Sequence, residues 1–90
     1  MKNYFNEYFN TINSGMQNVD IEVLISISKK IKEVKSNNGK VIIVGNGGSA
    51  AIASHVSIDF TKAAQIRSVT FNESSLLTCF SNDYGYDRWV

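Results

Sequence analysis

The feature that most constrains the fold is a short β-branched run that ends in a cluster of glycines. Residues 40–44 read Lys-Val-Ile-Ile-Val, and residues 45–49 read Gly-Asn-Gly-Gly-Ser. Such a run is typical of a strand buried on both faces in a parallel sheet, and the glycines mark the turn that ends it. Residues 50–64, rich in Ala and Ile, predict a helix, and residues 66–71 predict another strand. This order of elements is the crossover unit of an α/β fold.

Two helices are expected before this unit, over about residues 1–37. Apolar residues recur at helical spacing near the N-terminus until residues 13–15 interrupt the pattern, and they are Tyr4, Phe5, Tyr8, Phe9 and Ile12. A second helix follows Asp20, a residue that favours the N-cap position, and residues 36–39 end it.

A last helical segment is expected over about residues 74–90, with its helix over residues 74–80. The sequence holds no proline, repeat or linker, so we expect one domain, or part of one, over residues 1–90. The chain stops at Trp89-Val90 without a helix C-cap signal, which predicts that the domain is truncated there.

The charge balance and the apolar runs argue against several classes of partner. A net charge of +1, from nine basic and eight acidic residues, gives no field of one sign, so nucleic acid is not an expected partner. Three lysines interrupt the longest apolar run, which falls short of the roughly 20 residues that span a bilayer. The single Cys79 forms no internal disulfide, and the N-terminus is too polar for a secretory signal. We expect a cytoplasmic protein that does not bind membranes.

The glycine loop has two interpretations on its own chemistry. Gly45, Gly47 and Gly48 do not fit the GxGxxG pattern, because Ala50 stands where the third glycine is needed, and no Gly-Lys-Ser/Thr follows as in a P-loop. The loop is either a tight turn with Ser49 as the helix cap, or a site where free amides meet an anion or a polyhydroxylated ligand.

Two polar groups lie beyond the loop. His55 and Asp59 are four residues apart in the predicted helix, so both lie on one face. They either form a surface hydrogen bond or are two ligands of a divalent metal ion. Two ligands are half of the four that a tetrahedral zinc site needs. Residues 82–87 read Asn-Asp-Tyr-Gly-Tyr-Asp, which is ordinary turn chemistry unless a ligand is involved.

Taken in order, three motifs resemble the sugar isomerase (SIS) family and, within it, the phosphoheptose isomerases. They are Gly-Asn-Gly-Gly-Ser-Ala at residues 45–50, a histidine nine residues after Asn46, and Asn-Asp-Tyr-Gly-Tyr at residues 82–86. The resemblance covers the whole chain, most firmly from Lys40 onward. It implies the N-terminal half of an SIS domain, with a Rossmann-like parallel sheet flanked by helices and preceded by two helices.

The resemblance also implies an activity and the residues that carry it. The activity is the aldose–ketose interconversion of sedoheptulose 7-phosphate and a manno-heptose 7-phosphate, in heptose biosynthesis for lipopolysaccharide or capsule. His55 would be a zinc ligand, and Asp59 would be both a metal ligand and the catalytic base, where the family has a glutamate. The residues that would contact the sugar phosphate are Asn46, Gly47, Gly48, Ser49, Asn82 and Asp83.

In the family, a Ser/Thr-rich phosphate loop and the remaining metal ligands follow later in the chain, and the full-length protein is a homotetramer with sites between subunits. Two functions stay open. One is this isomerase, favoured by His55 together with residues 82–86. The other is a non-catalytic SIS module that binds a phosphosugar or a protein, favoured by Asp59 in place of glutamate. The sequence favours the enzyme.

Overall fold

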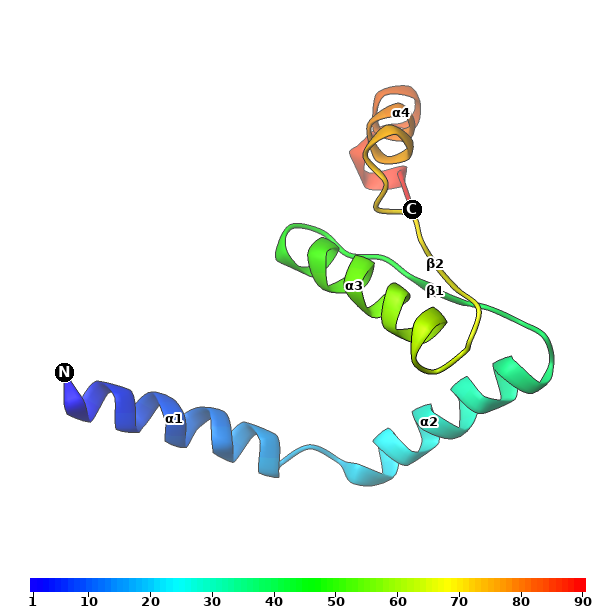
Figure 1. Cartoon of the computed structure of the whole chain (residues 1–90). Coiled ribbons are helices and arrows are strands. Elements are labelled where there is room, and N and C mark those ends of the chain that lie inside the picture. The colour runs from blue at the N-terminus through cyan, green and yellow to red at the C-terminus, as the bar shows by residue number, and fades with distance from the viewer. The chain divides into compact units, whose positions relative to one another are not determined.

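The computed structural model describes residues 1–90, and the chain divides into two compact units, Met1–Lys30 and Ile31–Val90 (Figure 1). The first unit holds α1 (Lys2–Gln17) and the start of α2 (Ile21–Ser36). The second unit holds the end of α2 and every later element. The predicted order of helix, helix, strand, helix, strand, helix is confirmed.

The first helix runs past the predicted break at residues 13–15. α1 continues to Gln17, and the amide of Asn18 donates to the Ser14 carbonyl at 3.1 Å to close it. The break was predicted too early, because weak helix formers at exposed positions cost only about 1 kcal/mol each. The prediction that Asp20 caps α2 is confirmed, since its Oδ1 accepts the amides of Glu22 at 2.9 Å and Val23 at 3.3 Å.

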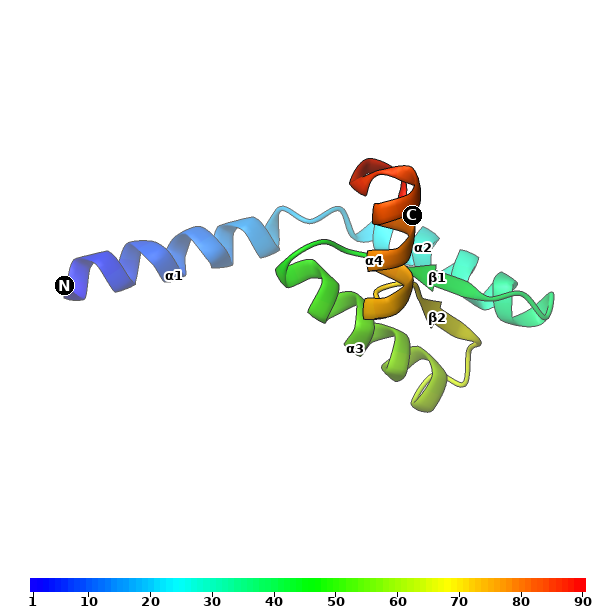
Figure 2. The same cartoon turned by 90° about the horizontal axis from the view of Figure 1, so that it is seen from above.

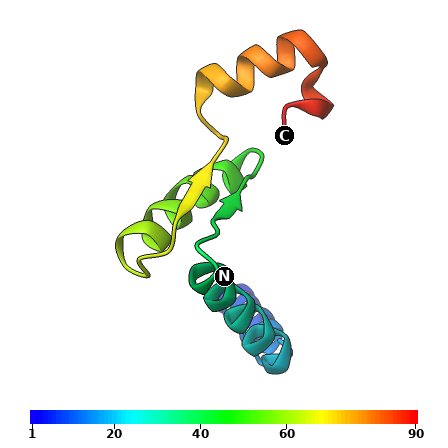
Figure 3. The same cartoon turned by 90° about the vertical axis from the view of Figure 1, so that its right-hand side faces the viewer.

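The sheet consists of two parallel strands, β1 (Val41–Ile43) and β2 (Ser68–Thr70), with α3 (Gly48–Lys62) between them in sequence. Figure 3 shows both arrows pointing the same way, beside α3. Val41 pairs with Ser68 and Ile43 with Thr70. Both strands are shorter than predicted, because the main chains stop pairing before the glycine loop.

The buried residues of the second unit lie where α3 packs on both strands. Ala53 and Ser57 of α3 are buried, as is Ile66 just before β2. The prediction that β1 is buried on both faces is wrong for this chain, because the side chain of Ile42 is 51% exposed. Helix α3 covers one face of the strand, and the alternation of β1 turns Ile42 to the other.

The last elements are α4 (Ser74–Tyr84) and a short 3₁₀ helix, η1 (Tyr86–Arg88), which pack together (Figure 2). Helix α4 extends beyond the predicted residues 74–80, so Asn82 and Asp83 lie in its last turn rather than in the turn that follows. That turn is at Gly85, whose φ of 98° favours glycine. No helix of the chain has the length and apolar character needed to span a bilayer.

Candidate functional site

The glycine loop lies at the carboxyl end of β1, where it leads directly into α3. A Cβ atom on Gly45 would overlap the Ser49 carbonyl group and lie 2.9 Å from the Ala50 nitrogen, so the first turn of α3 requires glycine there. Gly47 has a φ of 58° and is the N-cap residue of α3. The interpretation of Ser49 as the helix cap is therefore wrong, because Ser49 already lies inside the first turn.

The loop leaves the main-chain amides of Asn46, Gly47 and Gly48 without a partner. The amide of Ser49 donates to the Asn46 carbonyl at 3.0 Å, and the amide of Ala50 donates to the Gly47 carbonyl at 3.0 Å. No backbone or side-chain acceptor bonds the amides of Gly47 and Gly48, and both residues are exposed. Free amides at the N-terminus of a helix favour an anion or a polar oxygen of a ligand.

Asn72, which follows β2, binds the start of the loop through its side chain. Its Oδ1 accepts the Gly45 amide at 3.0 Å, and its Nδ2 donates to the Gly45 carbonyl at 2.6 Å. Residues 45 and 72 are both half-buried. Asn72 was not among the predicted site residues, although an Asn directly after a predicted strand that neighbours the loop strand was the available signal.

Tyr86 brings the C-terminal segment to the same loop. Its hydroxyl donates to the Asn46 Oδ1 at 3.1 Å, across 40 residues of sequence. The structure thus joins two of the three motifs, the glycine loop and residues 82–86, as one would expect of a shared site. Tyr86 was part of the predicted polar cluster but had no role assigned to it.

Asn82 and Asp83 are exposed and contact each other, with Asn82 Nδ2 donating to Asp83 Oδ1 at 3.1 Å. The Cys79 thiol donates to Asp83 Oδ2 at 3.6 Å. The negative charge of Asp83, and then this hydrogen bond, raise the pKa of the Cys79 thiol above its usual 9.0. No hydrogen bond joins Asn82 or Asp83 to the glycine loop.

His55 and Asp59 meet on the exposed face of α3. His55 Nε2 lies 3.5 Å from Asp59 Oδ2, and the two side chains are 76% and 57% exposed. Two ligands of a tetrahedral zinc ion lie about 3.3–3.5 Å apart, given metal–ligand distances near 2.0–2.1 Å. The pair therefore fits two positions of such a site, but no group of three or more His, Cys, Asp and Glu side chains exists in the chain.

The loop and the His55–Asp59 pair occupy different parts of α3. His55 and Asp59 lie seven and eleven positions after Gly48, which corresponds to about 10 and 16 Å along the helix axis. Tyr86 is bonded to the loop, whereas the pair is bonded only within itself.

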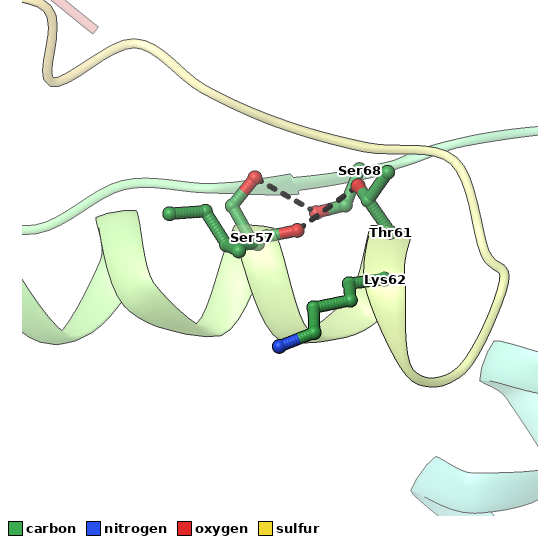
Figure 4. Close-up of a pocket in the computed structure, with 5 residues that line it drawn as sticks. Ser57, Thr61, Lys62 and Ser68 are labelled. Atoms are coloured by element: carbon green, nitrogen blue, oxygen red, sulfur yellow. Dashed lines mark hydrogen bonds between the residues drawn. The ribbon is translucent and has the colours of Figure 1, made fainter.

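A hollow of the second unit lies away from these residues. It has a volume of about 300 Å³ and lies between the second half of α3 and the start of β2, lined by Ser57, Ile58, Thr61, Lys62 and Ser68. Figure 4 shows two hydrogen bonds to Ser57 in this hollow: Ser68 Oγ donates to the Ser57 Oγ at 3.2 Å, and Thr61 Oγ1 donates to the Ser57 carbonyl at 3.0 Å. None of the predicted site residues lines it.

Comparison with curated proteins identifies a set of relatives. The chain is 34% identical over 88 residues to a probable phosphoheptose isomerase of Thermoplasma volcanium, covering 90% of the chain and 44% of that protein. It is 40% identical over 77 residues to the probable phosphoheptose isomerase of Thermoplasma acidophilum, covering 78% and 42%. It is 33% identical over 72 residues to the phosphoheptose isomerase of Roseiflexus sp., covering 73% and 36%.

No family model matches the chain, and no solved structure matches it significantly. The chain spans less than half the length of these curated relatives. The α/β architecture agrees with the expected part of an SIS domain. The chain is thus a homologue of the phosphoheptose isomerases over part of their length.

Proposed function

We propose that the protein is a sugar-phosphate isomerase that interconverts sedoheptulose 7-phosphate and a manno-heptose 7-phosphate. The observation that carries the proposal is the 32–40% identity to phosphoheptose isomerases over most of the chain. The position of the glycine loop supports it, because ligands of α/β folds bind at the carboxyl ends of the strands.

The exposed loop provides the first part of substrate binding. Asn46, Gly47, Gly48 and Ser49 form it, and the free amides of Gly47 and Gly48 are donors suited to oxygens of a sugar phosphate. The Tyr86 hydroxyl donates to the Oδ1 of Asn46. The side-chain Nδ2 of Asn46 is therefore left to donate to the ligand. Asn82 and Asp83 add an amide and a carboxylate for further contacts with hydroxyl groups.

Asp59 is the proposed catalytic base. Its carboxylate takes the proton from the carbon beside the carbonyl, the electron pair of that C–H bond forms a C=C bond, and the carbonyl oxygen takes the negative charge of an enediolate. A proton then passes from the hydroxyl group of the first carbon to the former carbonyl oxygen. Return of the first proton from Asp59 to the former carbonyl carbon leaves the carbonyl on the neighbouring carbon, so no oxidant or reductant is consumed. At 57% exposure the carboxylate is accessible to a ligand on this face of α3.

His55 and Asp59 would hold a zinc or similar divalent ion, since their 3.5 Å separation fits two ligand positions. When bound, such an ion stabilises negative charge on the oxygens of the enediol. The remaining ligands would come from outside these 90 residues or from another copy of the chain.

Residues from two copies would complete one site in a homo-oligomer, with a tetramer as the proposed form. The pair supports this, because it supplies only two ligands of a tetrahedral site and another copy is one source of the others. The exposed aromatic residues of α1, Tyr4, Phe5, Tyr8 and Phe9, are suited to packing between copies.

The experiment is an isomerisation assay of the intact protein with sedoheptulose 7-phosphate. We expect activity that is lost after chelation and restored by zinc. The His55→Ala variant should hold less zinc by metal analysis at unchanged thermal stability, with Asn37→Ala as an exposed control. Hexose and amino-sugar phosphates test the choice of sugar.

Absence of turnover with every sugar phosphate, in a folded intact protein that still binds them, would favour the non-catalytic module. None of the comparisons supports that alternative. Mixing Asp59→Asn subunits with Gly47→Val subunits tests the shared site, because activity should return only if each copy supplies the part that the other lacks.

A further inference from the structure

The start of the glycine loop is held by a side chain to which no role has been assigned above. We propose that Asn72 is a positioning residue, which fixes the glycine loop of residues 45–49 in the geometry that binds the ligand. The inference rests on the proposed function, in which this loop contacts the sugar phosphate.

Asn72 lies opposite Gly45 in the register of the sheet. Val41 pairs with Ser68, an offset of 27 residues, and the same offset of 27 separates Gly45 from Asn72. The main chains no longer pair at this point. The side-chain amide of Asn72 replaces them, because it carries the donor and the acceptor of a peptide group. It continues the ladder beyond its last main-chain pair, Ile43 with Thr70.

Several contacts fix the orientation of this amide. Thr70 Oγ1 donates to Asn72 Oδ1 at 3.3 Å and accepts the Asn72 main-chain amide at 3.3 Å. The first turn of α3 lies against the other side of Gly45. Because Gly45 is half-buried, loss of the Asn72 amide would leave its N–H and C=O groups poorly paired, which destabilises this geometry of the loop.

The consequence falls on the residues that follow Gly45. Both polar groups of Gly45 are used by Asn72, so the donors offered to a ligand begin at Asn46 and continue through Gly47 and Gly48. A displacement of Gly45 would move all three together. Displaced donors would make poorer hydrogen bonds to the oxygens of the ligand, so the effect is expected in substrate binding.

The test compares Asn72→Leu, which keeps the approximate size and loses both hydrogen bonds, with Asn72→Asp, which keeps the acceptor alone. Asn37→Ala is the matched control. In the intact protein we expect the KM for sedoheptulose 7-phosphate to rise about tenfold in Asn72→Leu and less in Asn72→Asp. We expect kcat to stay within about threefold, since Asp59 lies outside the loop. An unchanged KM in Asn72→Leu overturns the proposal, even if stability falls.

Amide hydrogen exchange by NMR, without substrate, separates this proposal from the isomerase itself. The Gly45 amide should exchange at least about tenfold faster in Asn72→Leu, whereas the Val41 amide, which donates to the Arg67 carbonyl at 2.9 Å, should keep its rate. Equal acceleration at both amides, or at neither, overturns the proposal. If Asn72→Leu does not fold, an Asn72→Asp variant with wild-type KM also overturns it. Absence of turnover in the wild type refutes the proposed function and leaves the exchange result decisive.

Discussion

The glycine loop leads into α3 and the His55–Asp59 pair lies further along that helix, yet the chain organises them very differently. The loop is held by Asn72, by the first turn of α3 and by Tyr86. The pair has one contact of 3.5 Å between two exposed side chains and no third donor. The geometry of the loop is therefore fixed within this chain, whereas the proposed metal site at the pair would need ligands from elsewhere. Substitutions at the pair should therefore affect activity, and substitutions in the loop should affect stability.

The largest effect is expected at the pair. Asp59→Asn keeps the shape of the side chain and removes the base, so kcat in the isomerisation assay should fall by about 10²–10⁴-fold. The thermal midpoint should stay within the range of ordinary surface substitutions, because the side chain is 57% exposed. Robust activity in this variant would refute the assignment of the base.

At the loop we expect a substitution to lower the stability of the fold. Gly45→Ala forces a Cβ atom into the Ser49 carbonyl group, so it should lower the free energy of unfolding by about 1–3 kcal/mol, measured by denaturant titration. Gly48→Ala is the control, since a Cβ there meets nothing within 4 Å. Equal stability of the two variants would show that the close approach does not constrain the loop.

A smaller effect is expected at Asp83, which the proposed site uses for substrate contact. Its charge raises the pKa of the Cys79 thiol, so less thiolate is present at neutral pH. Asp83→Asn should lower that pKa and speed alkylation of Cys79 by iodoacetamide several-fold at pH 7–8. Asp87→Asn is the control, and the same acceleration in both variants would contradict the contact.

The smallest effect is expected at the start of α4. Amides of Ser75 and Leu76 bond the Glu73 carboxylate and hold its pKa below the usual 4.5. A group with a lowered pKa in the folded state stabilises the fold above pH 4.5, and this contribution is lost as the pH falls through the lowered value. As the pH is lowered through that range, the thermal midpoint of the wild type should fall more than that of Glu73→Gln. An equal fall in the wild type and in Glu73→Gln would contradict the role of the Glu73 carboxylate as the cap of α4.

The local structure of the loop and of the pair could be predicted from the sequence, but the long-range contacts of the loop could not. The run from Val41 into glycine specified strand, loop and helix, because local propensity and spacing decide them. The contact of His55 with Asp59 followed from helical spacing alone. Asn72 and Tyr86 could not be placed, because their partners lie 27 and 40 residues away and depend on the register of β1 with β2. The exposure of Ile42 was also missed, since the strand pattern does not say how many faces are covered.

Asn72 and Glu73 are neighbours in sequence but bond in opposite directions. Asn72 bonds Gly45 at the start of the loop, and Glu73 Oε2 accepts the Leu76 amide at 3.0 Å inside α4. Two consecutive residues thus link the loop mechanically to the first turn of a helix whose last turn carries Asn82 and Asp83. The connection between β2 and α4 is therefore bonded to both of the elements that follow the strands, and no unbonded residue lies between Asn72 and Glu73.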